Sequence, residues 1–254
     1  MFNYITLKVL PAVCKFSTGR VAFKEQLKNA QKFKPSSQIW LSRQLNDKYV
    51  KQARIEHYRC RSAFKLIEIN KSYRILRPGQ VVVDLGCAPG SWTQVAVKCT
   101  KADYPDSKSL VVGVDLSPVH PVEGSVLLGG LNFTTESAQA QLAEHLEGRA
   151  VDVVLSDMAP SASGVKSLDH TNIISLCYSA LRFAEKMSSP GGSLVMKVFD
   201  GGESPQLLKD AKQLYEIVSI VRPEASRKES SEKFFVCLKF RKNSAREILE
   251  QKNP

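Results

Sequence analysis

Short apolar runs alternate with amphipathic segments over most of the chain. The runs have the length and β-branched composition of buried strands, and they lie at Val81–Leu85, Leu110–Leu116, Val126–Leu128, Val151–Asp157, Ser193–Phe199, Ile217–Val221 and Phe234–Phe240. Helical spacing is found between most of them, at Ser91–Cys99, Thr135–Glu147, Asn172–Lys186 and Ser204–Tyr215. This alternation predicts an α/β fold with a mainly parallel sheet and helices on both faces. The loop before the last run is too short for a crossover helix, so at least one of the last two strands should be antiparallel.

The segment before the first strand has a different pattern. Residues 46–57 and Ser62–Arg74 are expected to be helices, and Arg77-Pro78-Gly79 ends the second one. Residues 25–45 form a polar, basic lead-in, within which Pro35-Ser36-Ser37 is predicted to be a linker. The longest apolar runs have the length of strands, so no membrane-spanning helix is expected.

Charge is distributed unevenly along the 254 residues. The net charge is +11, and residues 1–65 hold 14 lysines and arginines against three acids, while the remainder balances at 22 of each sign. Residues 1–24 contain no acid and intersperse apolar with basic and hydroxyl residues, which is typical of a mitochondrial transit peptide. We therefore expect a mitochondrial matrix protein with a basic, polyanion-binding extension at 25–60, a main domain at 61–242 and a polar tail at 243–254.

Polar side chains end several of the predicted strands. A glycine-containing turn that starts at Asp84 opens a helix, Asp115 and Asp157 end two further strands, and Asn132 follows another. In open α/β sheets, ligands bind beyond the carboxyl ends of the strands. An acidic side chain there can bind ribose hydroxyls, and an amide can bind an adenine edge. Because neither a Walker motif nor GxGxxG is present, S-adenosylmethionine fits better than ATP or NAD.

Taken in order, these motifs resemble those of the FtsJ-type ribosomal-RNA 2′-O-methyltransferases, especially the mitochondrial large-subunit branch. The resemblance spans about residues 40–240. The matching stretches are Ser42–Tyr49, Tyr58–Leu66, Asp84–Trp92, Val114–Leu116, Leu155–Pro160, Met196–Phe199 and Ser226–Glu232.

The resemblance implies a Rossmann-like, seven-stranded sheet of order 3-2-1-4-5-7-6 and a uridine target in mitochondrial large-subunit rRNA. It also implies a catalytic tetrad of Lys65, Asp157, Lys197 and Glu232. The implied S-adenosylmethionine site comprises Asp84, Gly86, Pro89, Gly90, Ser91, Trp92, Asp115, Asn132 and Asp157. Two positions depart from the family pattern. Asn132 stands where the family often has an acid, and Ser91 replaces a frequent glycine, which is tolerated if its φ is negative.

Methyl transfer to a ribose hydroxyl requires alignment of the two reactants and removal of a proton. Lys197 ends a buried strand and is expected to point into the crevice. A lysine in water is protonated at neutral pH, but burial and a second cation from Lys65 would favour the neutral amine, which could act as general base. Asp157 and Glu232 would hold the lysines, and their negative charge opposes that effect. The sequence alone leaves the balance open.

A basic segment precedes the predicted core, with Tyr49, His57 and Tyr58 interleaved. Its cations should neutralise phosphates, and its aromatic rings could stack on unpaired bases. The RNA-binding residues expected here are Arg43, Lys48, Lys51, Arg54, Arg59 and Arg61.

Other readings remain open at this point. A non-catalytic rRNA-binding assembly factor could keep the same fold. A methyltransferase acting on base nitrogens or proteins is disfavoured because Asp157-Met158-Ala159-Pro160 lacks the usual Pro-Pro-Tyr/Phe pattern, and an NAD-linked oxidoreductase is disfavoured by the missing glycine fingerprint. The scattered cysteines and histidines predict no metal site. We expect a monomer that acts on the assembling large subunit.

Overall fold

The computed structural model describes residues 34–160, 164–227 and 229–242, and the chain divides into two compact units between Asp47 and Lys48. In the first unit, the described part is helix α1 (Pro35–Asn46). The predicted transit peptide and C-terminal tail lie outside the described residues.

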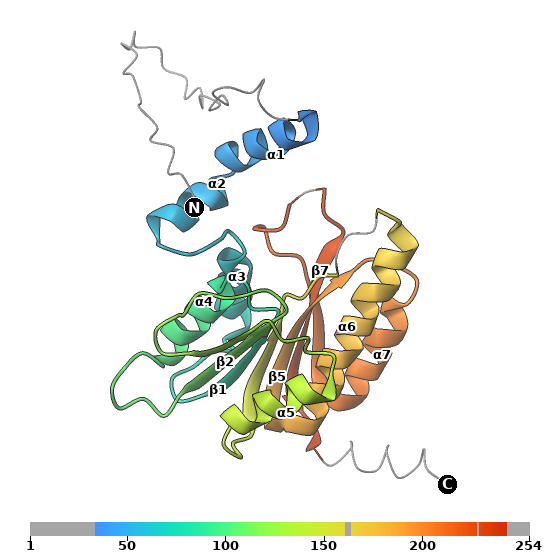
Figure 1. The fold of residues 1–254 in the computed structure, drawn as a ribbon. Helices are drawn as coiled ribbons and strands as arrows, with labels where there is room; N and C mark the ends of the chain where they lie inside the picture. Colours follow the sequence, from blue (N-terminus) through green and yellow to red (C-terminus); the bar gives the residue numbers. More distant parts are fainter. Residues whose placement is uncertain (1–33, 161–163, 228, 243–254) are drawn as a thin grey trace. The chain divides into compact units, whose positions relative to one another are not determined.

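The second unit carries an α/β fold (Figure 1). Its helices are α2 (Lys48–Ile55), α3 (Ala63–Tyr73), α4 (Ser91–Thr100), α5 (Glu136–His145), α6 (Lys166–Met187) and α7 (Ser204–Leu214). Its strands are β1 (Val81–Leu85), β2 (Leu110–Asp115), β3 (Val126–Gly129), β4 (Val151–Ser156), β5 (Ser188–Phe199), β6 (Tyr215–Val221) and β7 (Glu232–Phe240). Each predicted strand and each predicted helix of the sheet region is present, with boundaries displaced by a few residues.

The seven strands form one sheet in the order β3-β2-β1-β4-β5-β7-β6. Strands β1 to β5 pair in parallel, whereas β7 runs antiparallel to both β5 and β6. The predicted order and the predicted antiparallel ending are confirmed. Because β7 runs backwards, its first residues lie at the edge of the sheet where the parallel strands end.

Helices cover both faces of the sheet (Figure 1). One face packs against α5, α6 and α7 through residues such as Leu142, Leu181 and Leu207. The other face packs against α3 and α4 through residues such as Leu66 and Val95. Since successive strand residues point to opposite faces, buried strands need apolar side chains at nearly every position, as β1 has.

The N-terminal region differs from its prediction. The predicted linker at Pro35-Ser36-Ser37 is the first turn of α1, so that prediction is wrong. Proline suits the first helical position, because the N–H that it lacks would have no partner inside the helix there.

Over the described parts of the chain, no helix is both long enough and apolar enough to cross a membrane.

Candidate active site

The sheet register brings two distant charged residues to one edge. Lys197 pairs with Phe234 between β5 and β7, and Glu232 pairs with Phe199 two positions along. Lys197 therefore points to the same face as Val195, and Glu232 to the same face as Phe234. That face is the one covered by α3 and α4. Helix α3 carries Lys65, so the topology assembles three members of the predicted tetrad.

Lys197 is held by both the backbone and the side chain of Asp157. Its Nζ donates a hydrogen bond to the Asp157 carbonyl oxygen at 2.6 Å and lies 3.0 Å from Asp157 Oδ1. The Oδ1 contact is an ion pair without hydrogen-bond alignment. The lysine side chain is 8% exposed and the aspartate side chain 17%. The pair is therefore shielded from bulk solvent, and its interaction is stronger than that of a surface ion pair.

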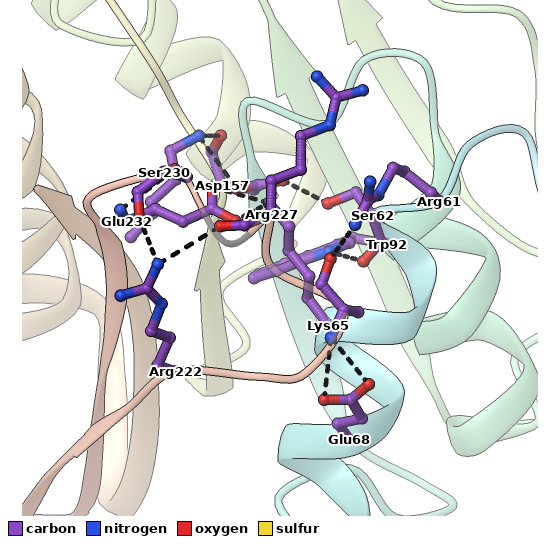
Figure 2. Close-up of polar contacts among 12 residues, drawn as sticks. Arg61, Ser62, Lys65, Glu68, Trp92, Asp157, Arg222, Arg227, Ser230 and Glu232 are labelled. Carbon is purple, nitrogen blue, oxygen red and sulfur yellow. Dashed lines mark hydrogen bonds and ion pairs between the residues drawn. The ribbon is translucent and has the colours of Figure 1, made fainter. Parts of the chain in front are cut away.

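Lys65 and Glu232 form the second ion pair. Lys65 Nζ lies 2.8 Å from Oε1 and 2.9 Å from Oε2 of Glu232. Both side chains are nearly buried. Figure 2 shows Lys65, Asp157 and Glu232 together, from α3, the end of β4 and the start of β7.

Ser62 is a site residue to which the sequence analysis assigned no role. Its Oγ donates a 2.6 Å hydrogen bond to Asp157 Oδ2, and its carbonyl oxygen accepts one from Trp92 Nε1 at 2.9 Å (Figure 2). A serine just before a helix normally caps that helix, but Ser62 makes no side-chain cap to α3. Its hydroxyl orients the Asp157 carboxylate instead.

Opposing effects act on the Asp157 carboxyl. Burial alone would raise its pKa, but Lys197, Lys65 and the Ser62 hydroxyl together outweigh burial, and the pKa lies below its ordinary value. Asp157 is therefore ionised at neutral pH.

A cavity of about 560 Å³ adjoins this cluster at the carboxyl ends of β1, β2 and β4. Gly86, Asp115, Asn132 and Asp157, four of the predicted cofactor residues, line it. Its volume falls within the usual range for small-molecule sites. Leu116, which is 70% exposed, is a further lining residue that the sequence analysis did not single out.

The turn after β1 is held by close contact with the loop after β4 and by hydrogen bonds to Asp115. Gly86 has φ +77°, and a Cβ there would lie 2.6 Å from the Cγ of Met158, so only glycine fits this approach to the loop after β4. Asp115 Oδ2 accepts a hydrogen bond from Ala88 N at 2.9 Å, and Oδ1 accepts one from Ser117 N at 2.7 Å. Asp115 thus ties together the two segments that line the cavity.

Comparison with known proteins identifies the family. The model of the FtsJ-like methyltransferases matches residues 58–240. The chain belongs to the FtsJ-like methyltransferase family. It is 49% identical over 221 residues to the mitochondrial rRNA methyltransferase 2 of Drosophila melanogaster, covering 86% of this chain and 88% of the relative. It is 46% identical over 231 residues to the ribosomal RNA large subunit methyltransferase E of Parvibaculum lavamentivorans, covering 89% of this chain and 90% of the relative.

A solved structure has the same fold. A Plasmodium falciparum protein described as a ribosomal RNA methyltransferase superposes with a TM-score of 0.64 and 29% identity, covering 72% of this chain and 98% of its own. The predicted family and fold are confirmed.

The remaining predicted cofactor residues of this FtsJ-like domain do not line the cavity. Asp84 is fully buried, and its Oδ2 accepts a 2.7 Å hydrogen bond from Thr93 Oγ1. Trp92 is 2% exposed and packs against Phe234, with ring centroids 5.7 Å apart. Ser91 is the first residue of α4, where φ is negative, so it is accommodated in place of glycine. Pro89 and Gly90 follow Ala88 in the same turn and are not among the residues that line the cavity.

The predicted RNA-binding residues fall into two groups. Arg43, Lys48 and Arg54 are exposed and Lys51 is partly exposed. In contrast, Arg59 donates hydrogen bonds to backbone carbonyls of two loops, and Arg61 donates one to the carbonyl of Ala225. The guanidinium groups of the second group are therefore engaged with loop carbonyl oxygens of the same domain.

The burial of Tyr49 does not suit the stacking role expected of it, whereas Tyr58 is only partly buried. Tyr49 is 9% exposed and packs against Phe64 at 5.5 Å between centroids, and Tyr58 meets the same ring edge-on at 5.8 Å. These rings form a small apolar core with Ala53 and Ala225, because removing their apolar surface from water is favourable.

Within the described ranges, no cluster of three His, Cys, Asp or Glu side chains suits a metal ion.

Proposed function

We propose that this protein transfers a methyl group from S-adenosylmethionine to the 2′-hydroxyl of a uridine ribose in mitochondrial large-subunit rRNA. The observation that carries the proposal is the pair of shielded ion pairs, Lys197 with Asp157 and Lys65 with Glu232, beside a cavity of cofactor size. The names of the relatives support an rRNA substrate, and the name of the Drosophila relative supports a mitochondrial one.

The cavity residues fit a cationic adenosyl ligand. Asp115 and Asn132 offer hydrogen-bonding groups for a ribose and an adenine edge. The charges of Asp157 and Asp115 both act to raise the pKa of the buried Asp84, so three carboxyl groups gather at this end of the sheet. One carboxylate oxygen, Asp84 Oδ1, is buried and has no hydrogen-bond partner. S-adenosylmethionine, when bound, supplies an electrophilic methyl group on a positively charged sulfur, which an acidic site favours.

Lys197 is suited to accept the hydroxyl proton. A neutral amine has two N–H groups and one lone pair. The carbonyl oxygen of Asp157 accepts one of the two N–H groups, and Oδ1 of the same residue keeps the amine in place, so the lone pair remains for the proton of the 2′-hydroxyl. The hydroxyl oxygen gains nucleophilicity as its proton moves to Lys197 Nζ.

The other three residues would hold this arrangement in place. Asp157, itself oriented by Ser62, fixes the position of Lys197. Glu232 fixes Lys65, whose charge adds to the field around Asp157. Catalysis would therefore depend on alignment and on one proton transfer, which suits a reaction with a good leaving group.

RNA would bind along the basic segment before the fold. The cations proposed for this contact are Arg43 of α1 and Lys48, Lys51 and Arg54 of α2. We further propose import into the mitochondrial matrix and action on the assembling large subunit. The acid-free start of the chain and the mitochondrial relative support this location.

The decisive experiment combines activity with nucleotide mapping. The protein is incubated with labelled S-adenosylmethionine and either naked large-subunit rRNA or assembling subunits, and the labelled nucleotide is identified. We expect label on a ribose 2′-oxygen. Label on a base or on protein would overturn the proposed reaction, and a wild-type protein that binds rRNA but transfers no methyl group would favour a non-catalytic assembly factor.

A substitution tests the role of Lys197. Lys197→Met removes the amine with little change in volume, and we expect transfer to fall at least about 100-fold, since general base catalysis contributes about 10²–10⁴. Cofactor affinity, measured by calorimetry, should remain within a few-fold of wild type. Full transfer by this variant would eliminate Lys197 as the base. Lys186→Met, a change on the exposed part of α6, serves as the matched control.

A further inference from the structure

Arg59 makes several hydrogen bonds that RNA binding would not require, and one of them is to residues 86–90, the turn after β1 that we call the cofactor turn. Its Nη1 donates hydrogen bonds to the carbonyl oxygens of Pro89 at 2.8 Å and His120 at 2.6 Å, and its Nη2 donates one to that of Pro121. Pro89 belongs to the turn after β1, whereas His120 and Pro121 belong to the segment after β2. One guanidinium therefore bridges two separate loops.

These two loops are also the walls of the cavity. Ala88, next to Pro89, lines it, and so does Ser117, three residues before His120. Asp115 already joins the two walls by accepting hydrogen bonds from Ala88 N and Ser117 N. Arg59 adds a second connection, so the turn is held at both Ala88 and Pro89.

Arg59 is itself held firmly. Its backbone N–H donates to Gln94 Oε1 at 2.9 Å, and Gln94 Nε2 donates to the carbonyl oxygen of His57 at 3.0 Å. Gly90 lies directly beneath the side chain, since a Cβ at Gly90 would meet Arg59 Nη1 at 2.6 Å. The absence of a side chain at Gly90 therefore leaves room for the Arg59 guanidinium.

We propose that Arg59 is a positioning residue for the cofactor turn, and that it sets the affinity for the adenosyl cofactor and not the affinity for RNA. The inference rests on the proposed S-adenosylmethionine site. The guanidinium of Arg59 has five N–H groups that can donate. Because it is charged, its hydrogen bonds to carbonyl oxygens are stronger than those of a neutral donor. A rigid turn loses less entropy when the ligand binds.

Loss of Arg59 should affect binding more than folding. Pro89, His120 and Pro121 are all exposed, so water can replace the guanidinium at their carbonyl oxygens. The stability cost is then small, in contrast to the cost of leaving a buried carbonyl unpaired. What is lost is one of the two connections between the walls of the cavity, and the one through Asp115 remains.

The test compares two affinities in Arg59→Ala and Arg59→Lys. Calorimetry with S-adenosylhomocysteine should show Kd raised by about tenfold or more in the alanine variant and by less in the lysine variant, which keeps a donor. The Kd for transcribed large-subunit rRNA should stay within about twofold, and kcat at saturating cofactor should change little. Thermal unfolding of each variant is measured in parallel.

Two control variants sharpen the comparison. Arg182→Ala removes an exposed arginine of α6 and should change neither affinity, whereas Arg54→Ala should weaken RNA binding alone. An unchanged S-adenosylhomocysteine Kd in Arg59→Ala overturns the inference, as does a loss confined to RNA. Parallel loss of both affinities in Arg59→Lys would assign Arg59 a general structural role and also overturn it. Failure of the wild-type protein to bind S-adenosylhomocysteine would instead refute the proposed cofactor.

Discussion

At the scale of single residues, Asp84 has the most unusual environment. It lies one residue before the end of β1 and is fully buried, and burial, with smaller contributions from Asp157 and Asp115, raises its pKa to about 7, although the Thr93 hydrogen bond opposes the shift. In the unfolded chain this carboxyl would titrate near pH 3.9. Between these two values the folded protein binds more protons than the unfolded chain, so stability falls as pH rises from about 4 to 7.

Asp84→Asn should remove this dependence. An amide cannot ionise, and it can still accept the Thr93 hydroxyl hydrogen bond. We expect the variant to gain stability relative to wild type as pH rises from 4 to 7, by an amount on the order of 1 kcal/mol or more, since one pKa unit corresponds to about 1.36 kcal/mol. Urea unfolding at pH 4, 5, 6 and 7 measures the difference. A constant difference across this range would contradict the raised pKa.

The sequence predicted which residues meet at the edge of the sheet better than it predicted their contacts. Asp115 and Asp157 could be predicted because each ends a strand, and parallel strands end at the same edge. The contacts of Ser62 and Arg59 could not be, because they join segments 95 and about 30–60 residues apart through side-chain directions that only packing decides. A serine before a helix and an arginine in a basic segment each have a commoner local role.

At the scale of elements, the loop between β6 and β7 is held by α3. The buried Ala225 donates its N–H to Glu68 at 3.1 Å, and its carbonyl oxygen accepts from Arg61. Within the loop, Arg222 Nη2 donates to the carbonyl oxygen of Ser230 at 2.6 Å (Figure 2). The loop leads directly into Glu232. Its attachment to α3 therefore fixes Glu232 relative to Lys65 of the same helix.

Glu68→Ala should disturb both stability and activity. Ala225 would lose the acceptor of its buried N–H, which costs about 1–3 kcal/mol of unfolding free energy. Since the loop also carries Glu232, we expect kcat to fall severalfold with little change in cofactor affinity. Urea unfolding and steady-state kinetics measure the two effects. Glu224→Ala, an exposed change in the same loop, should stay within about 0.5 kcal/mol of wild type. Equal behaviour of the two variants would refute the attachment.

Periodicity predicted the elements of the sheet and failed at the N-terminal side. The central strands, such as β1 and β4, are buried on both faces, so their sequences are nearly continuous apolar runs that are easy to recognise. Helix α1 has a weak apolar pattern and begins at a Pro-Ser-Ser sequence, which is typical of a linker as well as of a helix start. Local sequence could not decide between the two.

At the scale of the whole molecule, the separation of charge is the main feature. The excess of positive charge lies within residues 1–65, and the rest of the chain is neutral. Phosphate contacts release counterions, so binding through such a segment should weaken steeply with salt. The cavity proposed to bind the cofactor, lined by Asp115 and Asp157, has acidic side chains instead. The two ligands should therefore respond differently to ionic strength.

Reversing two charges of α2 tests this separation. Lys48→Glu combined with Arg54→Glu should raise the KM for RNA and leave the cofactor Kd unchanged. The slope of log K for RNA against log salt should become shallower by about 1.5, as expected from two lost phosphate contacts. Filter binding between roughly 50 and 200 mM salt measures the slope. Unaltered RNA affinity near physiological salt would exclude these residues from the RNA contact.

The reversed direction of β7 has a practical consequence for engineering this enzyme. The strand begins with Glu232, at the end of the sheet where the two ion pairs lie, and ends with Phe240 beside Tyr215, the first residue of β6. The last described strand thus delivers the chain to the rim opposite the one where ligands would enter. An affinity tag or fluorescent fusion appended after the C-terminus should leave turnover intact, whereas the same cargo inserted between Arg222 and Glu232 should abolish it.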